Sequence, residues 1–549
     1  MRFLKKIIKS LLNNKKYFIY LLLYSFIYLQ DQSIVSYQMK LAEGDSTSPN
    51  FFENIIDFNY FYNNGVYLFS QFEFSSPPLI GEHKWPSTDI LGNTINIFYL
   101  QYSTPNYDLT LGNLYLLYGR GLSMHTFEDQ DIDFDNSING VDFIYNLNNK
   151  ITLQASLGTT NIKSRTNPAD IIPSISIEND VFTFGGVISL DNLNMHYYSI
   201  AYSQAFDYKD INSLFDLTNI LGQYMNSRAD YFLETEPSYS MNNFEHNLGF
   251  DFNIGPMDYY IESSKVYYNK ISGERTQGYK NYLSSYINIY DFDVSFEFKD
   301  YNTPYLYNTF STPPIAFRET TSILASRNLH SIDFSNEYGY LFELNRLFEN
   351  NLSLLISYSF ALHHIDGIKD YNVFNLDDIL NFSEYWPYKQ YYIESSIWSI
   401  DGVSYYKLGY DYYHEVIDKK TILAKTVPIQ FSYNFKTGNS LSLYFEIQDK
   451  VITEELVQEE SIVLTSKESK YMYFTPTYNH FGKWTLSLFS DYEKNDKTIY
   501  GADYTFNYND SQISFFLGSQ KGGLVCANGS CIMQPDFTNG FKVTYRATL

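Results

Sequence analysis

The last ten residues of the sequence read GFKVTYRATL, residues 540–549. Apolar side chains occupy every second position, namely Phe541, Val543, Tyr545, Ala547 and Leu549. Because successive side chains of a strand point to opposite faces, this stretch predicts one β-strand with an apolar face and a polar face. Any half-buried edge strand would give this pattern, so its meaning depends on whether the rest of the chain repeats it.

The same period of two recurs along the sequence. It is clear over residues 151–157, 248–254, 292–298, 352–362 and 441–447. In each segment one face is apolar and the other carries charged or small polar side chains. These segments predict two-faced β-strands.

Two kinds of connection separate the predicted strands. Short turns rich in Gly, Asn, Asp and Pro occur at 63–65, 105–106, 148–149, 191–192, 255–256, 438–439, 482–483 and 509–510. Longer polar segments occur at 75–94, 118–137, 160–180, 204–245, 302–329, 364–388, 450–469 and 520–540. Such alternation is typical of outer-membrane barrels, which have tight periplasmic turns and long extracellular loops.

The strand count supports one closed barrel. About 23 strands can be counted from residue 53 onward, and 34–41 supplies one more, so we predict about 22–24 strands. The fold class is therefore all-β: a single large transmembrane antiparallel β-barrel over residues 33–549, in the cell outer membrane. Strands begin so early that no plug domain is expected before the barrel, and no helix is expected after residue 32.

Composition agrees with a barrel that has one lipid-facing and one wet face. The 549 residues include 55 Tyr and 44 Phe, yet the mean hydropathy is −0.29. Tyrosines at strand ends suit the aromatic girdles of such barrels. Biased coding composition is an alternative source of part of this aromatic excess.

The formal net charge of −24 makes nucleic acid an unsuitable partner. It favours cations instead, either inside a pore or bridging loops to an anionic lipid surface such as lipopolysaccharide.

Residues 1–32 resemble a secretory signal peptide, with a basic start followed by the apolar run 17–29. The cleavage site is placed only loosely, between residues 30 and 36. An uncleaved anchor helix is the alternative, although the apolar run is short for one.

The stretch 112–141, GNLYLLYGRGLSMHTFEDQDIDFDNSINGV, is the densest in candidate functional residues. Gly119 and Gly121 flank Arg120, which suits a sharp bend that projects a guanidinium, and a third candidate turn glycine is Gly140. Acidic and amide side chains follow at Glu128, Asp129, Asp131, Asp133, Asp135 and Asn136. Three interpretations stay open: a loop 118–137 folded into the lumen as a constriction or clamp, a solvated acidic loop, or a calcium site at Asp129, Asp131 and Asp133.

Cys526 and Cys531 are the two cysteines of the sequence. In an exported chain a C-x4-C pair inside a Gly-rich loop predicts a local disulfide, and no His lies nearby to complete a zinc site.

Two of these stretches resemble a family of uncharacterised Bacteroidota outer-membrane barrels of unknown function. The matching positions are Gly112, Asn113, Tyr115, Gly119, Gly121, Leu122, Glu128, Asp129, Asp135, Asn136, Gly140 and Val141, and then Gly522, Gly523, Cys526, Gly529, Cys531 and Pro535. The family has an Arg where this sequence has Gln130 and another where it has Ile532. The resemblance implies barrel architecture and outer-membrane location. Bacterial outer-membrane barrels also end on a strand like 540–549, which implies recognition by the barrel-assembly machinery.

No motif in the sequence indicates an enzyme or a cofactor. His363 and His364 stand at the end of a predicted strand near Asp366, but no nucleophilic Ser is marked as their partner. We predict a porin-like channel for small hydrophilic solutes that favours cations and is narrowed by 118–137. The alternative is a closed barrel that serves as a scaffold or docking platform for a surface or periplasmic protein partner. Charged inward positions (Asp251, Glu297, Lys299, Glu446) favour the channel, and bulky ones (Phe69, Leu355, Phe489) favour a filled lumen.

Overall fold

The computed structural model describes most of the chain from Ser33 to Thr548. The described residues are 33–45, 50–62, 65–76, 95–129, 134–163, 176–207, 238–269, 275–303, 310–320, 322–328, 330, 332–334, 336–364, 386–417, 420–458, 461–494, 496–527, 530–534 and 536–548. The predicted signal peptide therefore lies outside the described residues, as do Asp131, Asp133 and Leu549. No helix in the described part is long and apolar enough to cross a membrane.

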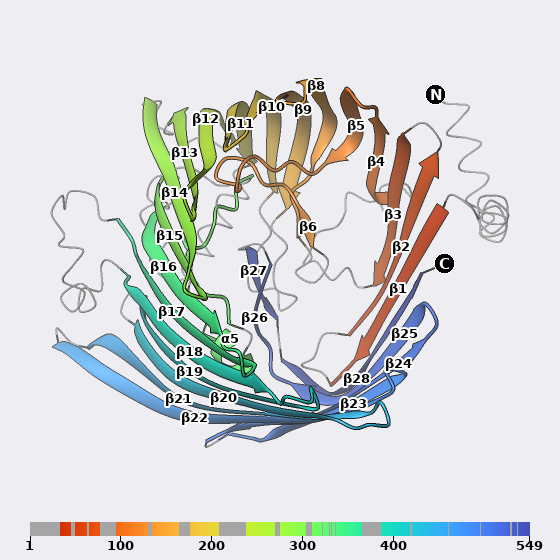
Figure 1. Cartoon of the computed structure of the whole chain (residues 1–549), viewed down its shortest axis with the longest axis vertical. Helices are drawn as coiled ribbons and strands as arrows, with labels where there is room; N and C mark the ends of the chain where they lie inside the picture. The colour runs from red at the N-terminus through yellow and green to blue at the C-terminus, as the bar shows by residue number, and fades with distance from the viewer. Residues whose placement is uncertain are drawn as a thin grey trace.

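Twenty-four strands form one antiparallel sheet that closes on itself (Figure 1). Its first twelve strands are β1 (Ser33–Glu43), β2 (Phe51–Tyr62), β3 (Val66–Ser76), β4 (Ile95–Ser103), β5 (Tyr107–Leu114), β8 (Ile138–Asn148), β9 (Ile151–Lys163), β10 (Ser176–Leu190), β11 (Leu193–Asp207), β12 (Ser238–Ile254), β13 (Met257–Asn269) and β14 (Arg275–Ile289). The remaining twelve are β15 (Phe292–Asn302), β16 (Asn336–Leu347), β17 (Leu352–Leu362), β18 (Tyr388–Trp398), β19 (Ser404–Ile417), β20 (Lys420–Asn434), β21 (Ser440–Gln458), β22 (Ser461–His480), β23 (Trp484–Glu493), β24 (Ile499–Tyr508), β25 (Ser511–Gln520) and β28 (Phe537–Thr548). The predicted fold and strand number are confirmed, including a first strand before residue 53.

Smaller elements lie off this sheet. They are the strand pair β6 (Glu128–Asp129) and β7 (Phe134–Asp135), the helix α5 (Ile323–Ser326), and the hairpin of β26 (Gly523–Ala527) and β27 (Ser530–Gln534). Figure 1 draws β6, α5 and the β26–β27 hairpin within the ring of the barrel strands. The helix corrects the expectation that no helical residues follow the signal peptide.

The strand β28 closes the barrel, because it pairs with β25 on one side and β1 on the other. Val543 stands opposite both Leu41 and Phe515, and Tyr545 stands opposite Met39. The ring of Tyr545 also lies 5.9 Å from that of Tyr37. The apolar face of the closing strand therefore continues the apolar face of its two neighbours.

The outside of the barrel is apolar and its inner wall is polar. On β8, Val141, Phe143 and Tyr145 are about 40% exposed, whereas the intervening Asp142 is 6% exposed and accepts a hydrogen bond from Ser156. In a water-soluble protein the exposed face of a sheet is polar and the buried face is apolar. The opposite arrangement here fits an outer surface that faces lipid. The chain is thus a transmembrane barrel of the outer membrane.

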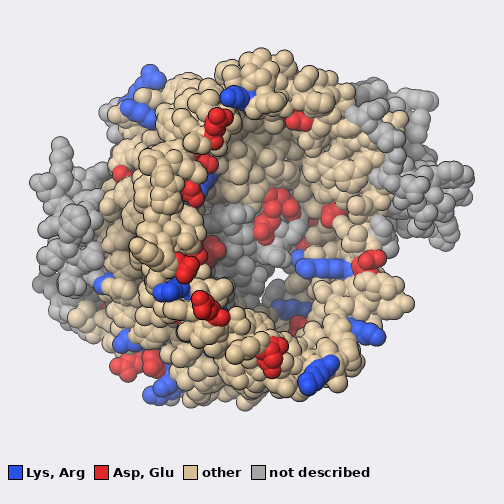
Figure 2. Space-filling view, viewed as in Figure 1, with Lys and Arg blue, Asp and Glu red and all other residues tan. Residues whose placement is uncertain are grey.

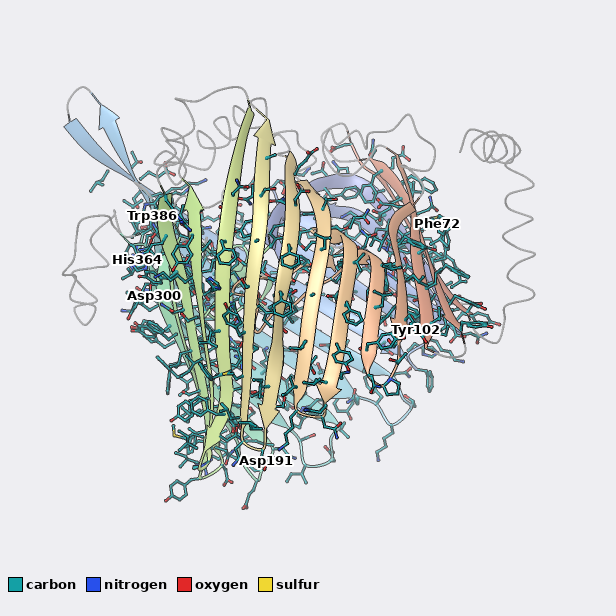
Figure 3. The ribbon with its side chains drawn as sticks, turned by 90° about the horizontal axis from the view of Figure 1, so that it is seen from above. Phe72, Tyr102, Asp191, Asp300, His364 and Trp386 are labelled. Carbon is teal, nitrogen blue, oxygen red and sulfur yellow. The ribbon has the colours of Figure 1, made fainter. Side chains whose placement is uncertain are left out.

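The two ends of the barrel differ in their connections. Ser33 and Thr548 lie at the end with the short turns, where Figure 3 also labels Asp191 of the β10–β11 turn. His364 and Trp386 lie toward the opposite end of the strands in the same view. In an outer-membrane barrel the short-turn end is periplasmic and the other end is extracellular.

The expectation of a long loop at 450–469 is wrong. These residues belong to β21 and β22, which are 19 and 20 residues long and are joined by two residues only. The β19–β20 connection at the same end of the barrel also has only two residues, so short and long connections do not strictly alternate. The apolar residues of this segment stand in adjacent groups, Val451-Ile452, Leu456-Val457 and Ile462-Val463-Leu464, so it shows no strict period of two and its charged residues suggested a loop.

Replacing Val543 by Lys should destabilise the barrel by about 2–4 kcal/mol, because an ammonium would face lipid in the closing strand. Urea unfolding of the protein refolded in lipid vesicles measures this loss. The matched control is Thr544→Lys, whose side chain points to the polar lumen from the adjacent position. Equal losses for the two variants would contradict the assignment of the outer face.

Candidate luminal site

The chain leaves the barrel wall after β5 and runs along the inner wall before it returns at β8. We call residues 115–129 and 134–137 the first inward segment. Its Tyr118 is fully buried, and the ring stacks on that of Tyr198 of β11 at 3.8 Å between centroids. The Tyr118 hydroxyl lies 2.5 Å from Thr183 Oγ1 of β10, and Met124 packs in the same buried cluster. The segment is therefore fixed to the wall by a local core.

The predicted bend at Gly119, Arg120 and Gly121 is formed. Gly119 and Gly121 have φ angles of +57° and +87°, which glycine adopts without strain. The Arg120 backbone N–H donates to Glu262 Oε2 of β13 at 2.8 Å. A Cβ on Gly119 would stand 2.5 Å from Glu262 Oε1. A side chain at this position is thus excluded both by the backbone angle and by the carboxylate.

The Arg120 side chain lies against two tyrosines of the inner wall. Its guanidinium carbon stands 4.3 Å from the centre of the Tyr260 ring, and Nη1 donates to the Tyr282 hydroxyl at 3.1 Å. The Tyr282 hydroxyl in turn donates to Glu297 Oε2 at 2.9 Å. Arg120 is exposed to the lumen and forms no ion pair within the described part of the chain.

The predicted acidic residues occupy a different part of the same segment. Glu128 and Asp129 form β6, which pairs with Phe134 and Asp135 of β7. The Asp135 carboxylate accepts the Ser137 backbone N–H at 2.8 Å. Within the described residues the Arg120 side chain bonds to Tyr282 and not to these carboxylates, so the bend and the acids are separate features.

Asn136 is a structural residue of this segment. Its Oδ1 accepts the Phe127 N–H at 2.7 Å, and its Nδ2 donates to the His125 carbonyl at 3.2 Å. Gly140 lies within β8 instead of in a turn, and a Cβ there would clash with the Leu157 carbonyl oxygen. The calcium hypothesis stays a prediction, since two of its three aspartates lie outside the described residues.

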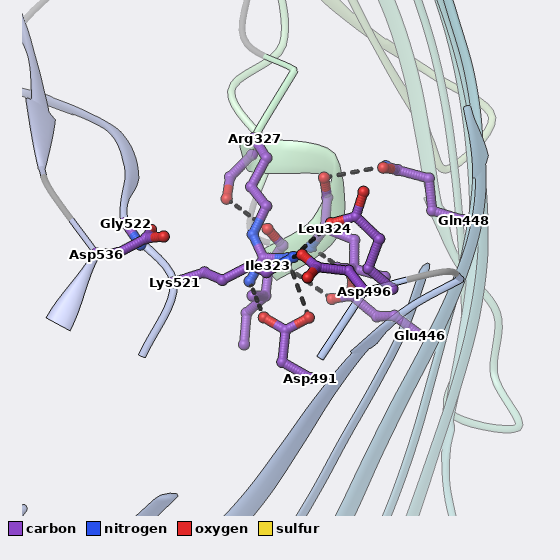
Figure 4. A network of polar contacts seen from close by, with 12 residues as sticks. Ile323, Leu324, Arg327, Glu446, Gln448, Asp491, Asp496, Lys521, Gly522 and Asp536 are labelled. Atoms are coloured by element: carbon purple, nitrogen blue, oxygen red, sulfur yellow. Dashed lines mark hydrogen bonds and ion pairs between the residues drawn. The ribbon is translucent and has the colours of Figure 1, made fainter. Parts of the chain in front are cut away.

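A second segment also folds against the inner wall, which the sequence interpretation missed. We call the described residues of 310–334 the second inward segment, although 302–329 was expected to be an external loop. Figure 4 shows its helix α5 held by Glu446 of β21, whose carboxylate accepts the N–H groups of Ile323 and Leu324 at 2.7 and 2.6 Å. Arg327, directly after the helix, pairs with Asp491 of β23.

A buried cluster of charges anchors the end of the second inward segment. Lys299 of β15 pairs with Glu337 of β16, and His330 lies between Glu337 and Glu415 of β19, at 3.2 and 2.6 Å. All four side chains are at most 3% exposed. Burial disfavours the charged imidazole, but the two carboxylates outweigh this and raise the pKa of His330 to about 9.

The two inward segments contact each other. Lys280 of β14 donates from Nζ to the Leu122 carbonyl at 2.9 Å and to Ser311 Oγ at 2.6 Å. The His125 N–H donates to the Phe310 carbonyl at 2.5 Å. One wall lysine therefore joins both segments into a continuous lining.

The inward positions expected from the sequence divide into two groups. Asp251 and Glu297 border an open recess of the wall, whereas Lys299 and Glu446 are covered by the second inward segment. His364 pairs with Asp300 at 2.9 Å.

Figure 2 shows that the centre of the molecule is hollowed and that acidic side chains gather inside it.

The cysteines occupy opposite positions of the β26–β27 hairpin. Cys526 is the direct antiparallel partner of Cys531. Directly opposed residues have Cα atoms about 4.5–5.5 Å apart, which suits a disulfide. The disulfide stays a prediction.

Comparison with known proteins finds one family model that matches part of the chain and a set of barrel structures of similar fold. Residues 12–179 match the model of a family of unknown function, DUF6029. No curated protein matched the chain.

Among solved structures the chain is similar to the siderophore receptor PirA from Pseudomonas aeruginosa, with 6% identity, a TM-score of 0.44, and coverage of 94% of this chain and 80% of that one. It is similar to the iron transporter FrpB from Neisseria meningitidis, with 7% identity, a TM-score of 0.42, and coverage of 95% and 83%. It is also similar to the translocation pore of the P pilus usher PapC, with 9% identity, a TM-score of 0.36, and coverage of 94% and 98%.

Replacing Gly119 by Ala should detach the first inward segment from the wall. The left-handed backbone costs about 1–2 kcal/mol for a non-glycine residue, and the contact with Glu262 adds about 1–3 kcal/mol. Hydrogen exchange of residues 115–127 in the refolded protein measures the detachment. Gly402→Ala is the matched control, because Gly402 has a φ of +68° and a Cβ there would meet no atom within 4 Å. Equal exchange in both variants at 115–127 would contradict the role of the Glu262 contact.

Docking of the second inward segment should weaken as the pH rises through about 9. The pKa of His330 is raised from its ordinary 6.5 to about 9, so its contribution is complete below about 6.5 and lost at alkaline pH. The docking free energy that protonated His330 contributes, and that is lost at alkaline pH, amounts to at most about 3 kcal/mol. Protease cleavage within 310–334 across pH 6 to 10 tests this, and His330→Gln should remove the pH dependence. A pH dependence that persists unchanged in this variant would contradict it.

Proposed function

We propose that the protein is an outer-membrane channel for small hydrophilic solutes with a preference for cations. The observations that carry the proposal are that both inward segments are packed on the wall and that the centre of the molecule is hollowed (Figure 2). A barrel of 24 strands is wide enough to keep an aqueous lumen when its loops lie against the wall.

The charge of the lumen supports the cation preference. Glu128 and Asp129 of the first inward segment lie on β6, which projects inside the ring of strands in Figure 1. The wall lysines Lys280 and Lys299 are buried, and each contacts an inward segment or a wall carboxylate. Carboxylates at a narrowing attract cations and repel anions.

The inward segments are firmly attached to the wall, which favours the role of a fixed constriction and not that of a movable plug. Tyr118, Glu446 and the His330 cluster each tie a segment to a different part of the wall. Removing one partner of a buried ion pair strongly destabilises a protein, because the other charge is left without compensation. Detaching a segment would break several such contacts at once. We therefore assign these segments a fixed narrowing role, and we propose no catalytic role for any of their residues.

A docking platform is a second candidate function, favoured by one observation. The β21–β22 hairpin extends beyond its neighbours, since β20 pairs with β21 only up to Glu454 and β23 pairs with β22 only from Tyr471. The backbone edge of β22 before Lys470 is thus open within the described structure, and open strand edges can pair with a partner strand.

Single-channel recordings in a planar bilayer with a salt gradient test the channel. We expect steady, cation-selective steps, and the double change Glu128→Gln with Asp129→Asn should lower the cation preference several-fold because it removes two luminal charges. The control Asp191→Asn changes an exposed carboxylate of a short turn and should leave selectivity unchanged. A correctly folded barrel that conducts no ions would overturn the channel and favour the docking platform.

A further inference from the structure

A recess of about 200 Å³ lies in the lumen wall where the first inward segment makes its bend. Its lining comes from the bend and from the neighbouring strands β12 to β15, and includes Arg120, Asp251, Asp258, Tyr260, Ser284 and Glu297. The volume is below the ~300–1,000 Å³ of sites for drug-sized ligands, so the recess suits a small solute.

The strand register directs most of these side chains into the lumen. Tyr260 is opposite Asp251 on β12 and Ser284 on β14, and Ser284 is opposite Glu297 on β15. Directly opposed residues share one face of a sheet, and Tyr260 is buried against Arg120 on the inner face. Asp258 has the same orientation, because it lies two residues before Tyr260 on the same strand.

Arg120 presents unused hydrogen-bond donors to this recess. A guanidinium has five N–H donors, and the Arg120 side chain donates one hydrogen bond within the described residues, to Tyr282. Its contact with the Tyr260 ring covers the aromatic face on which a sugar would otherwise stack. The chemistry offered to a solute is therefore that of a planar cation, which binds carboxylates through two parallel hydrogen bonds.

The opposite charge is also available in the recess. Asp251 and Asp258 are exposed to the lumen, and neither forms a salt bridge in the described part of the chain. Glu297 accepts the Tyr282 hydroxyl and lies in the same lining. The acids outnumber the single cation, so a simple anion is repelled while a group that carries an ammonium is attracted.

We propose that this recess binds amino-acid-sized zwitterions, with the solute carboxylate on Arg120 and its ammonium against Asp251 and Asp258. This assignment rests on the proposed channel function and names the class of solute that the channel selects. Glycine at 119 and 121 lets the backbone turn tightly enough to project Arg120 into the recess, and Glu262 holds that turn.

Saturation-transfer NMR on the protein refolded in detergent micelles tests the binding, with L-glutamine, ethanolamine, propionate and erythritol as probes. We expect L-glutamine to bind more tightly than the other three. Arg120→Gln should weaken L-glutamine binding at least tenfold, as expected for the loss of charged hydrogen bonds. The double variant Asp251→Asn with Asp258→Asn should weaken L-glutamine binding to a similar extent, and both changes lie on wall strands and not in the first inward segment.

Two controls keep the test decisive. Lys265→Gln removes a cation from the outer face of β13 and should leave L-glutamine binding unchanged. Arg120→Lys retains the charge but not the planar fork, so its affinity should lie between those of the native protein and Arg120→Gln. L-Glutamine binding that equals erythritol binding, or that survives both the Arg120 and the double Asp change, overturns the proposal.

A swelling assay on proteoliposomes separates this inference from the channel function. Erythritol entry without preference for L-glutamine would retain the channel and overturn the zwitterion site. L-Glutamine binding in micelles without entry of either solute would overturn the open channel and retain the site.

Discussion

The structure depends on the requirement that every backbone N–H and C=O inside a lipid bilayer be paired within the protein. Lipid offers no hydrogen bonds, so a sheet with a free edge cannot span it. The pairing of β28 with β1 removes that edge, over the register from Ser36 with Thr548 to Glu43 with Phe541. Once the sheet is closed, its outer face must be apolar, and polar side chains are left to the inside.

The inverted polarity explains how the inward segments are held. A segment that docks on a polar wall meets carboxylates, lysines and amides, so it is bound largely by ion pairs and hydrogen bonds. Glu446 caps α5, Asp491 pairs with Arg327, and Lys280 bridges both segments. Apolar contacts occur where the wall supplies them, as at Tyr198 and Ile200 around Tyr118. Buried charges are tolerated there because each faces an opposite charge or a hydrogen-bond partner.

Arg120 and the acidic residues that follow it show that functional residues close together in the sequence need not form one site. The sequence places them within 15 residues, which suggested opposite charges facing each other across a channel. In the structure the bend packs on β13 and β14, whereas the acids form a separate strand pair. The partners that matter for Arg120, Tyr260 and Tyr282, come from more than 130 residues away. No local pattern in a single sequence identifies such partners.

Strand periodicity was enough to predict the barrel, its strand number and the orientation of the closing strand. Those features follow from alternation along each strand, which is a local property. The route of 310–334 back into the lumen and the recess beside Arg120 were decided by tertiary structure. The cluster of Lys299, Glu337, His330 and Glu415 joins β15, the second inward segment with the following β16, and β19. The physical reason is that a charged residue at an inward position is compatible with open water or with a buried partner, and only the packed structure decides which one it meets.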